Sequence, residues 1–307
     1  MSTDIIGIGL STLDHLYLLD DVSTFPAGTL LEFSIQGGGP ASTAMAAAAR
    51  LGASCGMIAA VGDDERGKEI LTSLRSCGVD TSHSIIHPGA SSCAVLVIVD
   101  ARTGDRHFFV LQRNFPSIGV DEIDWAYVAS ARIVHFDTQV IGVEAVLNKA
   151  RTLGVTISMD AGVQAGLEAA WVPLVDVFIG GADDPAWRER PEDALDAARR
   201  IAARGPQSVI LTLGAAGCVG LSREGGFHLP AFQVEVVDTT GTGDVFHGAF
   251  LYATNRGWPP EASARFASAA AALGATRLGG RAGLATAREV AAFLSSRGQT
   301  GPWSSGT

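Results

Sequence analysis

The sequence contains few cysteines, few basic residues and no apolar run of membrane-spanning length. Cysteine occupies only four of its 307 positions, and Cys55, Cys77, Cys93 and Cys218 form no C-x-x-C pair. A disulfide framework is therefore excluded, and we expect reduced, buried thiols in a cytoplasmic protein. The seven histidines include no HExxH motif, so the sequence predicts no catalytic zinc site.

Positive charge is scarce. The chain has 22 Lys and Arg against 32 Asp and Glu, a formal net charge of −10. This balance argues against nucleic acid or an anionic membrane as the main partner. It leaves room for a phosphorylated ligand, because helix dipoles and Mg²⁺ act locally. We also find neither the charged start and long apolar run of a signal peptide nor a transmembrane segment.

Length and composition indicate one large α/β domain, over residues 1–297, followed by a mobile tail at 298–307. Apolar segments of strand length alternate with helical stretches such as Glu192–Ala203. The strand candidates are Ile5–Gly9, Ile133–Phe136, Val155–Asp160, Val175–Ile179 and Val209–Leu213. Such alternation predicts a doubly wound, mostly parallel sheet with helices on both faces and ligands at the strand C-termini.

Two glycine-rich segments resemble nucleotide motifs but lack a required residue. Gly7-x-Gly9 would begin a dinucleotide-binding GxGxxG motif, yet Thr12 stands at the third glycine position. This disfavours an NAD-dependent oxidoreductase. Residues 62–69 read G-x-x-x-x-G-K, but Glu69 replaces the Ser or Thr that a P-loop needs for Mg²⁺. We therefore reject the P-loop reading.

The most informative stretch is Asp238-Thr-Thr-Gly-Thr-Gly-Asp244, after which apolar residues recur at helical spacing. A glycine turn entering a helix presents backbone N–H groups beside the positive end of the helix dipole. We expect Gly241, Thr242 and Gly243 to stabilise a phosphate charge there. Asp244, in the first helical turn, could accept a proton from an attacking hydroxyl. Taken alone, an Asp at a helix start is more often a simple cap.

The full string DTTGTGDVFHGAF resembles the C-terminal signature of the PfkB/ribokinase family of sugar and nucleoside kinases, usually written DTTGAGD. Thr242 replaces the commoner alanine, which a backbone donor tolerates. GGGPASTAMAAAARLG, at residues 37–52, resembles the family's N-terminal motif. The likeness covers roughly residues 4–297 and implies a ribokinase-like fold.

The resemblance also implies where substrates bind. A small β-sheet lid would be formed by residues 14–36 and 92–112 and would exclude water from the sugar site. The expected sugar contacts are Asp14, Gly38, Gly39, Thr43 and Asn114, although many relatives carry Asn at the Thr43 position.

On the nucleotide side, the family pattern T-x-G-x-x-G matches Thr212, Gly214 and Gly217, which would approach the phosphates or ribose of ATP. A monovalent cation, often K⁺ in relatives, would be enclosed by the side chains and carbonyls of Asp238, Thr240, Gly274, Gly279 and Gly283. Many relatives have an N-x-x-E motif linked to Mg²⁺. Here Gly181 takes the Asn position and Asp184 the Glu position, so Asp184 is the candidate for a water-mediated Mg²⁺ contact.

The resemblance predicts an ATP-dependent sugar kinase with Asp244 as general base, a ketose or furanose as acceptor and a possible homodimer through the lid. Several segments look most like the branch that holds sulfofructose kinase and its ketose-kinase neighbours. Residues 137–139 lack the arginine that a sulfonate would require. The alternatives are a nucleoside or 2-keto-3-deoxygluconate kinase, or a non-catalytic sugar or nucleotide sensor on the same fold.

Overall fold

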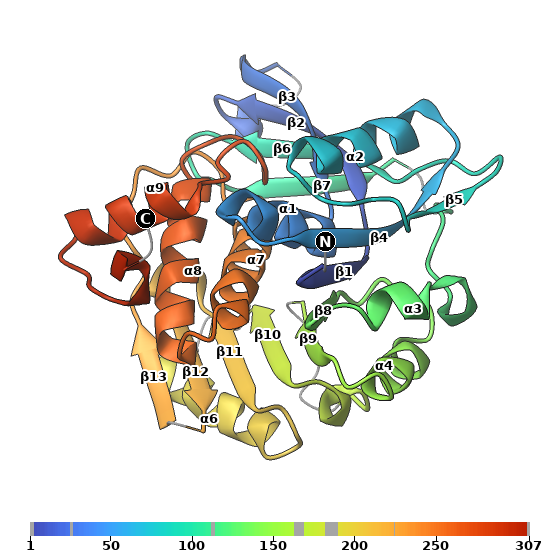
Figure 1. Ribbon diagram of the computed structural model, residues 1–307. Helices are drawn as coiled ribbons and strands as arrows, with labels where there is room; N and C mark the ends of the chain where they lie inside the picture. The colour runs from blue at the N-terminus through green and yellow to red at the C-terminus, as the bar shows by residue number, and fades with distance from the viewer. Residues whose placement is uncertain are drawn as a thin grey trace.

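A nine-stranded sheet forms the centre of the molecule, in the order β13-β12-β11-β10-β9-β8-β1-β4-β5 (Figure 1). The computed structural model describes residues 3–24, 27–111, 114–162, 169–181, 190–223 and 225–305. The strands are β1 (Ile5–Gly9), β4 (Cys55–Gly62), β5 (Ile85–His87), β8 (Ile133–Phe136), β9 (Thr156–Asp160), β10 (Val177–Gly181), β11 (Ser208–Thr212), β12 (Cys218–Ser222) and β13 (Gly225–Leu229). Neighbouring strands from β11 to β5 run parallel, and β12 and β13 add an antiparallel edge.

Helices cover both faces of this sheet, so its strands are apolar on both sides. In β10, Phe178 packs into the core of one face while Val177 and Ile179 pack into the other. The first face carries α3 (Trp125–Val128), α4 (Val143–Arg151) and α6 (Pro191–Ala202); the second carries α1 (Pro40–Leu51), α2 (Glu65–Ser76), α7 (Thr242–Asn255), α8 (Pro260–Gly274) and α9 (Ala287–Ser296). The doubly wound α/β architecture predicted from the sequence is confirmed.

Small residues bring α1 close to α7, and this contact fixes the position of α7. A side chain at Gly248 of α7 would place its Cβ 2.1 Å from the carbonyl oxygen of Ala44 in α1. Helix α1 itself begins after Gly39, which has a φ of +92°, and ends at Gly52, which is left-handed. Both glycines supply backbone conformations that other residues rarely adopt.

A separate four-stranded sheet in the order β3-β2-β6-β7 lies beside the main body (Figure 1). It consists of β2 (Thr12–Leu19), β3 (Leu30–Gly38), β6 (Ala94–Asp100) and β7 (Arg106–Val110), and we call it the lid sheet. Leu16, Val97 and Val99 on its inner face pack with Leu278. Its strands fall within the two segments expected to form a lid, except that β2 begins at Thr12 and β3 ends at Gly38.

The C-terminal segment is packed against the body at Trp303, whereas we expected a mobile tail over residues 298–307. Trp303 is 5% exposed, and its ring lies 6.1 Å from that of Trp258 and 6.3 Å from that of Phe266. Burial of a large aromatic side chain outweighs the entropy lost in ordering a short tail. Among the described helices, none is both long and apolar enough to cross a membrane.

Candidate active site

The turn at residues 238–244 leads into the N-terminus of α7, as the sequence predicts. Gly241 is the N-cap residue with a φ of +71°, and its carbonyl accepts the N–H of Val245 at 2.9 Å. The N–H of Thr242 donates to the carbonyl of Thr239 at 3.3 Å, so this amide is partly used within the turn. Gly243 is exposed. N–H groups in a first helical turn have no acceptor within the helix, so this end of α7 offers donors that suit an anion.

The loop at residues 275–283 supports this turn from behind. A Cβ on Gly241 would lie 2.7 Å from the Cα of Gly280, so the two backbones are in close contact. A Cβ on Gly243 would meet no atom within 4 Å. The face of the turn at Gly243 is therefore open, and the face at Gly241 is closed.

Asp244 lies among other carboxylates. Burial raises its pKa well above the usual range, and the charges of Asp160, Asp137 and Asp14 raise it further, while Arg281 opposes them. Burial also raises the pKa of Asp14, whose carboxylate accepts the hydroxyl of Thr12 at 2.6 Å. A carboxylate with a raised pKa is a stronger base once ionised, which suits proton abstraction.

Asp137 was not assigned a role from the sequence, although it follows strand β8 directly. Its carboxylate accepts the N–H groups of Leu10 at 2.8 Å, Gln139 at 2.9 Å and Ala41 at 3.3 Å. Burial still raises its pKa to about 6, and the nearby Asp160 contributes. Asp137 thereby joins the first strand, the start of α1 and the loop after β8. Its place after a buried parallel strand was the available signal.

Arg281 is the second residue that sequence reasoning missed. The residue is 9% exposed, and its guanidinium donates to the Ser42 hydroxyl at 2.5 Å, to the Ser73 hydroxyl at 3.0 Å and to the Gly38 carbonyl at 3.2 Å. Burial lowers its pKa to about 10, although the charges of Cys77, Asp14 and Asp244 act in the other direction.

Among the expected sugar contacts, Asp14 is the one whose charge acts on Asp244. A Cβ on Gly38 would be 2.0 Å from the Asp14 carboxylate, and one on Gly39 would be 2.3 Å from the carbonyl oxygen of Leu10. Thr43 is buried, and its methyl group faces the backbone of Gly280. Asn114 is exposed, and within the described part of the chain no hydrogen bond connects it to these residues.

The expected nucleotide segment forms a tight turn after β11. Thr212 donates to the carbonyl of Gly180 at 3.3 Å, which links the ends of β11 and β10. Gly214 and Gly217 have φ values of +57° and +96°, and a Cβ on Gly217 would collide with the carbonyl oxygen of Leu229. Both glycines therefore have a structural role in the turn. Gly214 is also exposed, so a ligand could reach it. Asp184, the Mg²⁺ candidate, lies outside the described residues.

Hydrogen bonds join the residues expected around a monovalent cation. Oδ1 of the buried Asp238 accepts both the N–H and the hydroxyl of Thr240 at 2.8 Å, and Oδ2 accepts the N–H of Gly279 at 2.8 Å. A Cβ on Gly283 would lie 2.6 Å from the Gly274 carbonyl oxygen, so these two glycines are also adjacent. Side-chain and carbonyl oxygens are the ligands that a hard cation prefers.

Within the described residues, no group of three His, Cys, Asp or Glu side chains is arranged to hold a metal ion. His83 and His87 have an H-x-x-x-H spacing, but each faces its own carboxylate, Asp124 at 3.0 Å and Glu122 at 3.4 Å. The rejected P-loop segment is a helix start, where Asp64 accepts the N–H of Gly67 at 2.9 Å.

Comparison with known proteins supports one family. Residues 12–287 match the model of the pfkB family carbohydrate kinases. An ATP-dependent ribose-1-phosphate kinase of Halopiger xanaduensis is 32% identical over 270 residues, 85% of this chain and 87% of that protein. A 2-dehydro-3-deoxygluconokinase of Thermoproteus tenax is 28% identical over 299 residues, 92% of each.

A solved ribokinase of Arabidopsis thaliana, complexed with ribose and ATP, has the same fold, with a TM-score of 0.79 and 21% identity over 96% of this chain and 99% of that one. Together with the motif around Asp244, these matches identify the reaction class. The chain belongs to the PfkB family of carbohydrate kinases, and it is a phosphotransferase that acts on a sugar hydroxyl.

Proposed function

We propose that this kinase transfers the γ-phosphate of ATP to a primary hydroxyl of a ketose or furanose, with Asp244 as general base. One observation carries the assignment of the base: Asp244 is in the first turn of α7, next to the open face at Gly243. A hydroxyl held by Asp244 would therefore be adjacent to a phosphate held at the helix N-terminus. The base and the anion site lie within the four consecutive residues 241–244, which favours in-line transfer.

Charge is stabilised at the N-terminus of α7. The amides of Gly241 and Gly243 and the positive end of the 14-residue helix would face the transferring group. Thr242 contributes less than expected, because its amide also donates to Thr239. Removal of one such donor typically lowers the rate by on the order of 10²-fold.

The described residues fit a Mg²⁺ ion that arrives with the nucleotide better than one held by a protein cage, because they contain no suitable cluster of side chains. Bound to the phosphates, Mg²⁺ would neutralise their charge. The Asp238–Thr240–Gly279 network offers oxygens for K⁺, with Gly274 and Gly283 beside it. A cytoplasmic location stays a prediction, which the four free cysteines fit.

The test measures ADP release with Mg·ATP, in K⁺ or Na⁺, across ketoses, pentoses, 2-keto-3-deoxygluconate, sulfofructose and nucleosides. Asp244→Asn is compared with Asp196→Asn, which removes an exposed carboxylate from α6. We expect one acceptor to be phosphorylated, Asp244→Asn to lose about 10²–10⁴-fold in kcat, and Asp196→Asn to match wild type. Equal kcat in both variants would exclude Asp244 as the base. No turnover, together with a sugar-dependent rise in melting temperature, would favour the sensor alternative.

One observation favours the nucleoside alternative, an exposed aromatic side chain on the inner face of the lid sheet. By strand register, Phe108 of β7 shares the lid face with Val97 and Leu16, which pack with Leu278. Its side chain is 54% exposed on that inner face. An accessible aromatic ring under a lid is suited to stacking on a base.

The outer face of the lid sheet supports the proposed homodimer. Tyr17 and Phe33 are opposite each other, with ring centroids 4.8 Å apart, and Phe33, Ile35 and Phe109 are each about half exposed. A continuous apolar sheet face of this kind usually has a partner. We expect a second copy to cover it, so Phe33→Glu should convert a dimer into a monomer in light scattering. A monomeric wild type would refute this assignment.

A further inference from the structure

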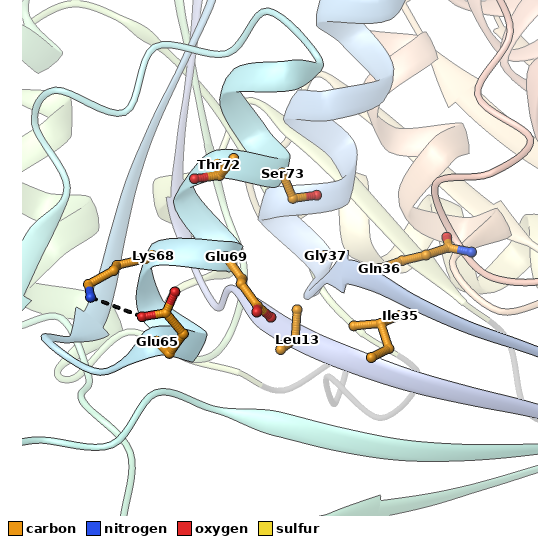
Figure 2. A pocket seen from close by; sticks show the side chains of 9 residues that line it. All are labelled: Leu13, Ile35, Gln36, Gly37, Glu65, Lys68, Glu69, Thr72 and Ser73. Atoms are coloured by element: carbon orange, nitrogen blue, oxygen red, sulfur yellow. Dashed lines mark hydrogen bonds and ion pairs between the residues drawn. The ribbon is translucent and has the colours of Figure 1, made fainter.

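Arg281 occupies the junction where the lid, α1 and α2 meet. Its guanidinium is anchored on Gly38 at the end of β3, on Ser42 in α1 and on Ser73 in α2. Its own N–H donates to the side chain of Gln36 in β3 at 3.1 Å. Gln36, Gly37 and Ser73 also line a cavity of about 430 Å³ between α2 and the lid strands (Figure 2).

All three anchors of this guanidinium are neutral. A buried cation needs a compensating charge, because desolvation is costly when only neutral groups surround it. The charges that offset it are those of Cys77, Asp14 and Asp244, and within the described residues the guanidinium hydrogen bonds go to Ser73, Gly38 and Ser42 instead. Within the described residues its Nε atom has no hydrogen-bond partner. The guanidinium is therefore fixed by neutral groups, and its positive charge acts on the two carboxylates.

Asp244 faces charged groups from several elements. Asp14 is on β2, Asp137 follows β8 and Asp160 ends β9, and all three are acidic. Behind Asp160 lies the buried His247, with its Nε2 3.7 Å from Oδ1 of Asp160, and the ring of His135 is 5.3 Å from that of His247. Burial lowers the pKa of both histidines, so they are neutral near pH 7. Arg281 alone opposes the three carboxylates among the charges that act on Asp244.

The same side chain fixes the loop that supports the anion site. Gly280 precedes Arg281 and contacts Gly241. The anchors at Gly38 and Ser42 thus hold the 275–283 loop onto the glycine turn of the sugar side. Loss of these anchors would loosen Gly280 beneath the catalytic turn.

We propose that Arg281 is a positioning residue of the kinase reaction, which keeps Asp244 ionised and fixes the 275–283 loop against the glycine turn at 37–39. The proposal rests on the proposed role of Asp244. Arg281 has two roles in this proposal: its positive charge acts on Asp244, and its hydrogen bonds hold the 275–283 loop. Separate substitutions can remove the charge or the hydrogen bonds.

Arg281→Met and Arg281→Gln remove the charge, and Arg281→Lys keeps it but loses the forked hydrogen bonds. For the neutral variants we expect the midpoint of the acidic limb of the kcat–pH profile to rise by about one pH unit. The kcat should therefore be about tenfold lower than that of wild type below the midpoint, and it should reach the wild-type value at high pH. Arg281→Lys should keep the midpoint and raise the KM for the sugar. Arg50→Met, which removes an exposed charge at the far end of α1, should change neither.

A second measurement does not depend on turnover. The carboxyl carbon of Asp244 is followed by NMR in protein labelled with ¹³C at aspartate, with Asp244→Asn to identify the signal. We expect its titration midpoint to rise by about one pH unit in either neutral variant and to stay in place in Arg281→Lys. An unmoved midpoint in a folded neutral variant, or a loss of kcat by the same factor at every pH, would overturn the proposal. Should wild type show no Asp244-dependent turnover, the proposed function fails, and the titration still decides whether Arg281 acts on Asp244.

Discussion

Two glycines of the turn at residues 238–244, Gly241 and Gly243, should respond in opposite ways to substitution by alanine. Gly241 has a φ of +71° and lies against Gly280, whereas Gly243 lies within α7 and has open space where a Cβ would stand. If the anion binds at this open face, a methyl group on Gly243 would occupy its place. A methyl group on Gly241 would instead disturb the backbone.

The magnitudes follow from these environments. Alanine at position 241 should cost about 1–2 kcal/mol for the left-handed conformation, and more because its Cβ would be 2.7 Å from a backbone carbon. Alanine at position 243 replaces a helical glycine and should stabilise the fold by about 0.5–1 kcal/mol. Its methyl group should nevertheless lower kcat by on the order of 10²-fold, the usual effect of losing one anion-hole contact.

The assay pairs urea unfolding with ADP release under saturating sugar. Gly257→Ala is the matched control, because Gly257 also has a positive φ, +75°, and open space around it, but follows the far end of α7. It should lose stability through its backbone and keep its kcat. If Gly243→Ala retained wild-type kcat, the phosphate would not bind at this face. If Gly241→Ala were as stable as wild type, the contact with Gly280 would not constrain the turn.

Three further predictions concern stability. Trp303→Ala should lower the free energy of unfolding by about 3–5 kcal/mol in urea, because the side chain is buried beside Trp258 and Phe266. An unchanged urea midpoint would indicate that this segment is mobile, as the sequence predicted. Folding raises the pKa of Asp137 from 3.8 to about 6. Above pH 6 the ionised carboxylate therefore lowers the free energy of unfolding by about 3 kcal/mol, and this loss disappears as the pH falls towards 4. Asp137→Asn should remove that component of the difference in unfolding free energy between pH 7 and pH 4.5. Burial lowers the pKa of His247, so below about pH 6.5 only the unfolded state gains this proton and the free energy of unfolding falls. His247→Asn should reduce this fall. An identical pH dependence of stability in the variant and in wild type would contradict the burial argument.

Much of the fold could be predicted from local sequence patterns. Apolar strands buried on both faces, such as Ile5–Gly9 and Ile133–Phe136, lie where their composition predicted. Glycines with special conformations marked the ends of α1 and the start of α7. These features depend on a few neighbouring residues, so the sequence displays them directly. The same locality explains why one short stretch predicts both a base at Asp244 and an anion site at Gly241–Gly243.

The missed residues share a different property. Arg281 reaches Gly38 across 243 positions of the chain, and Asp137 reaches Leu10 across 127. No periodicity or cap signals such a contact, because each partner belongs to a different element. An arginine in a glycine-rich loop resembles an ordinary surface residue, and the position of Asp137 after a buried strand indicates a ligand edge of the sheet without naming its partners. Trp303 was missed for a related reason, since its partners Trp258 and Phe266 lie outside its own segment.

The charge distribution of the site connects its chemistry to its stability. Burial raises the pKa of Asp244, and repulsion from Asp160, Asp137 and Asp14 raises it further, which makes Asp244 a stronger base. The same repulsion destabilises the folded state whenever Asp244 is ionised, since an acid whose pKa is raised by folding loses stability as pH rises through that pKa. Arg281 opposes both effects. A more basic Asp244 would be ionised less often near neutral pH, and a less basic one would take a proton from the sugar less readily. The net charge of −10 thus says little about anion binding, because the balance is set within this cluster and at the N-terminus of α7.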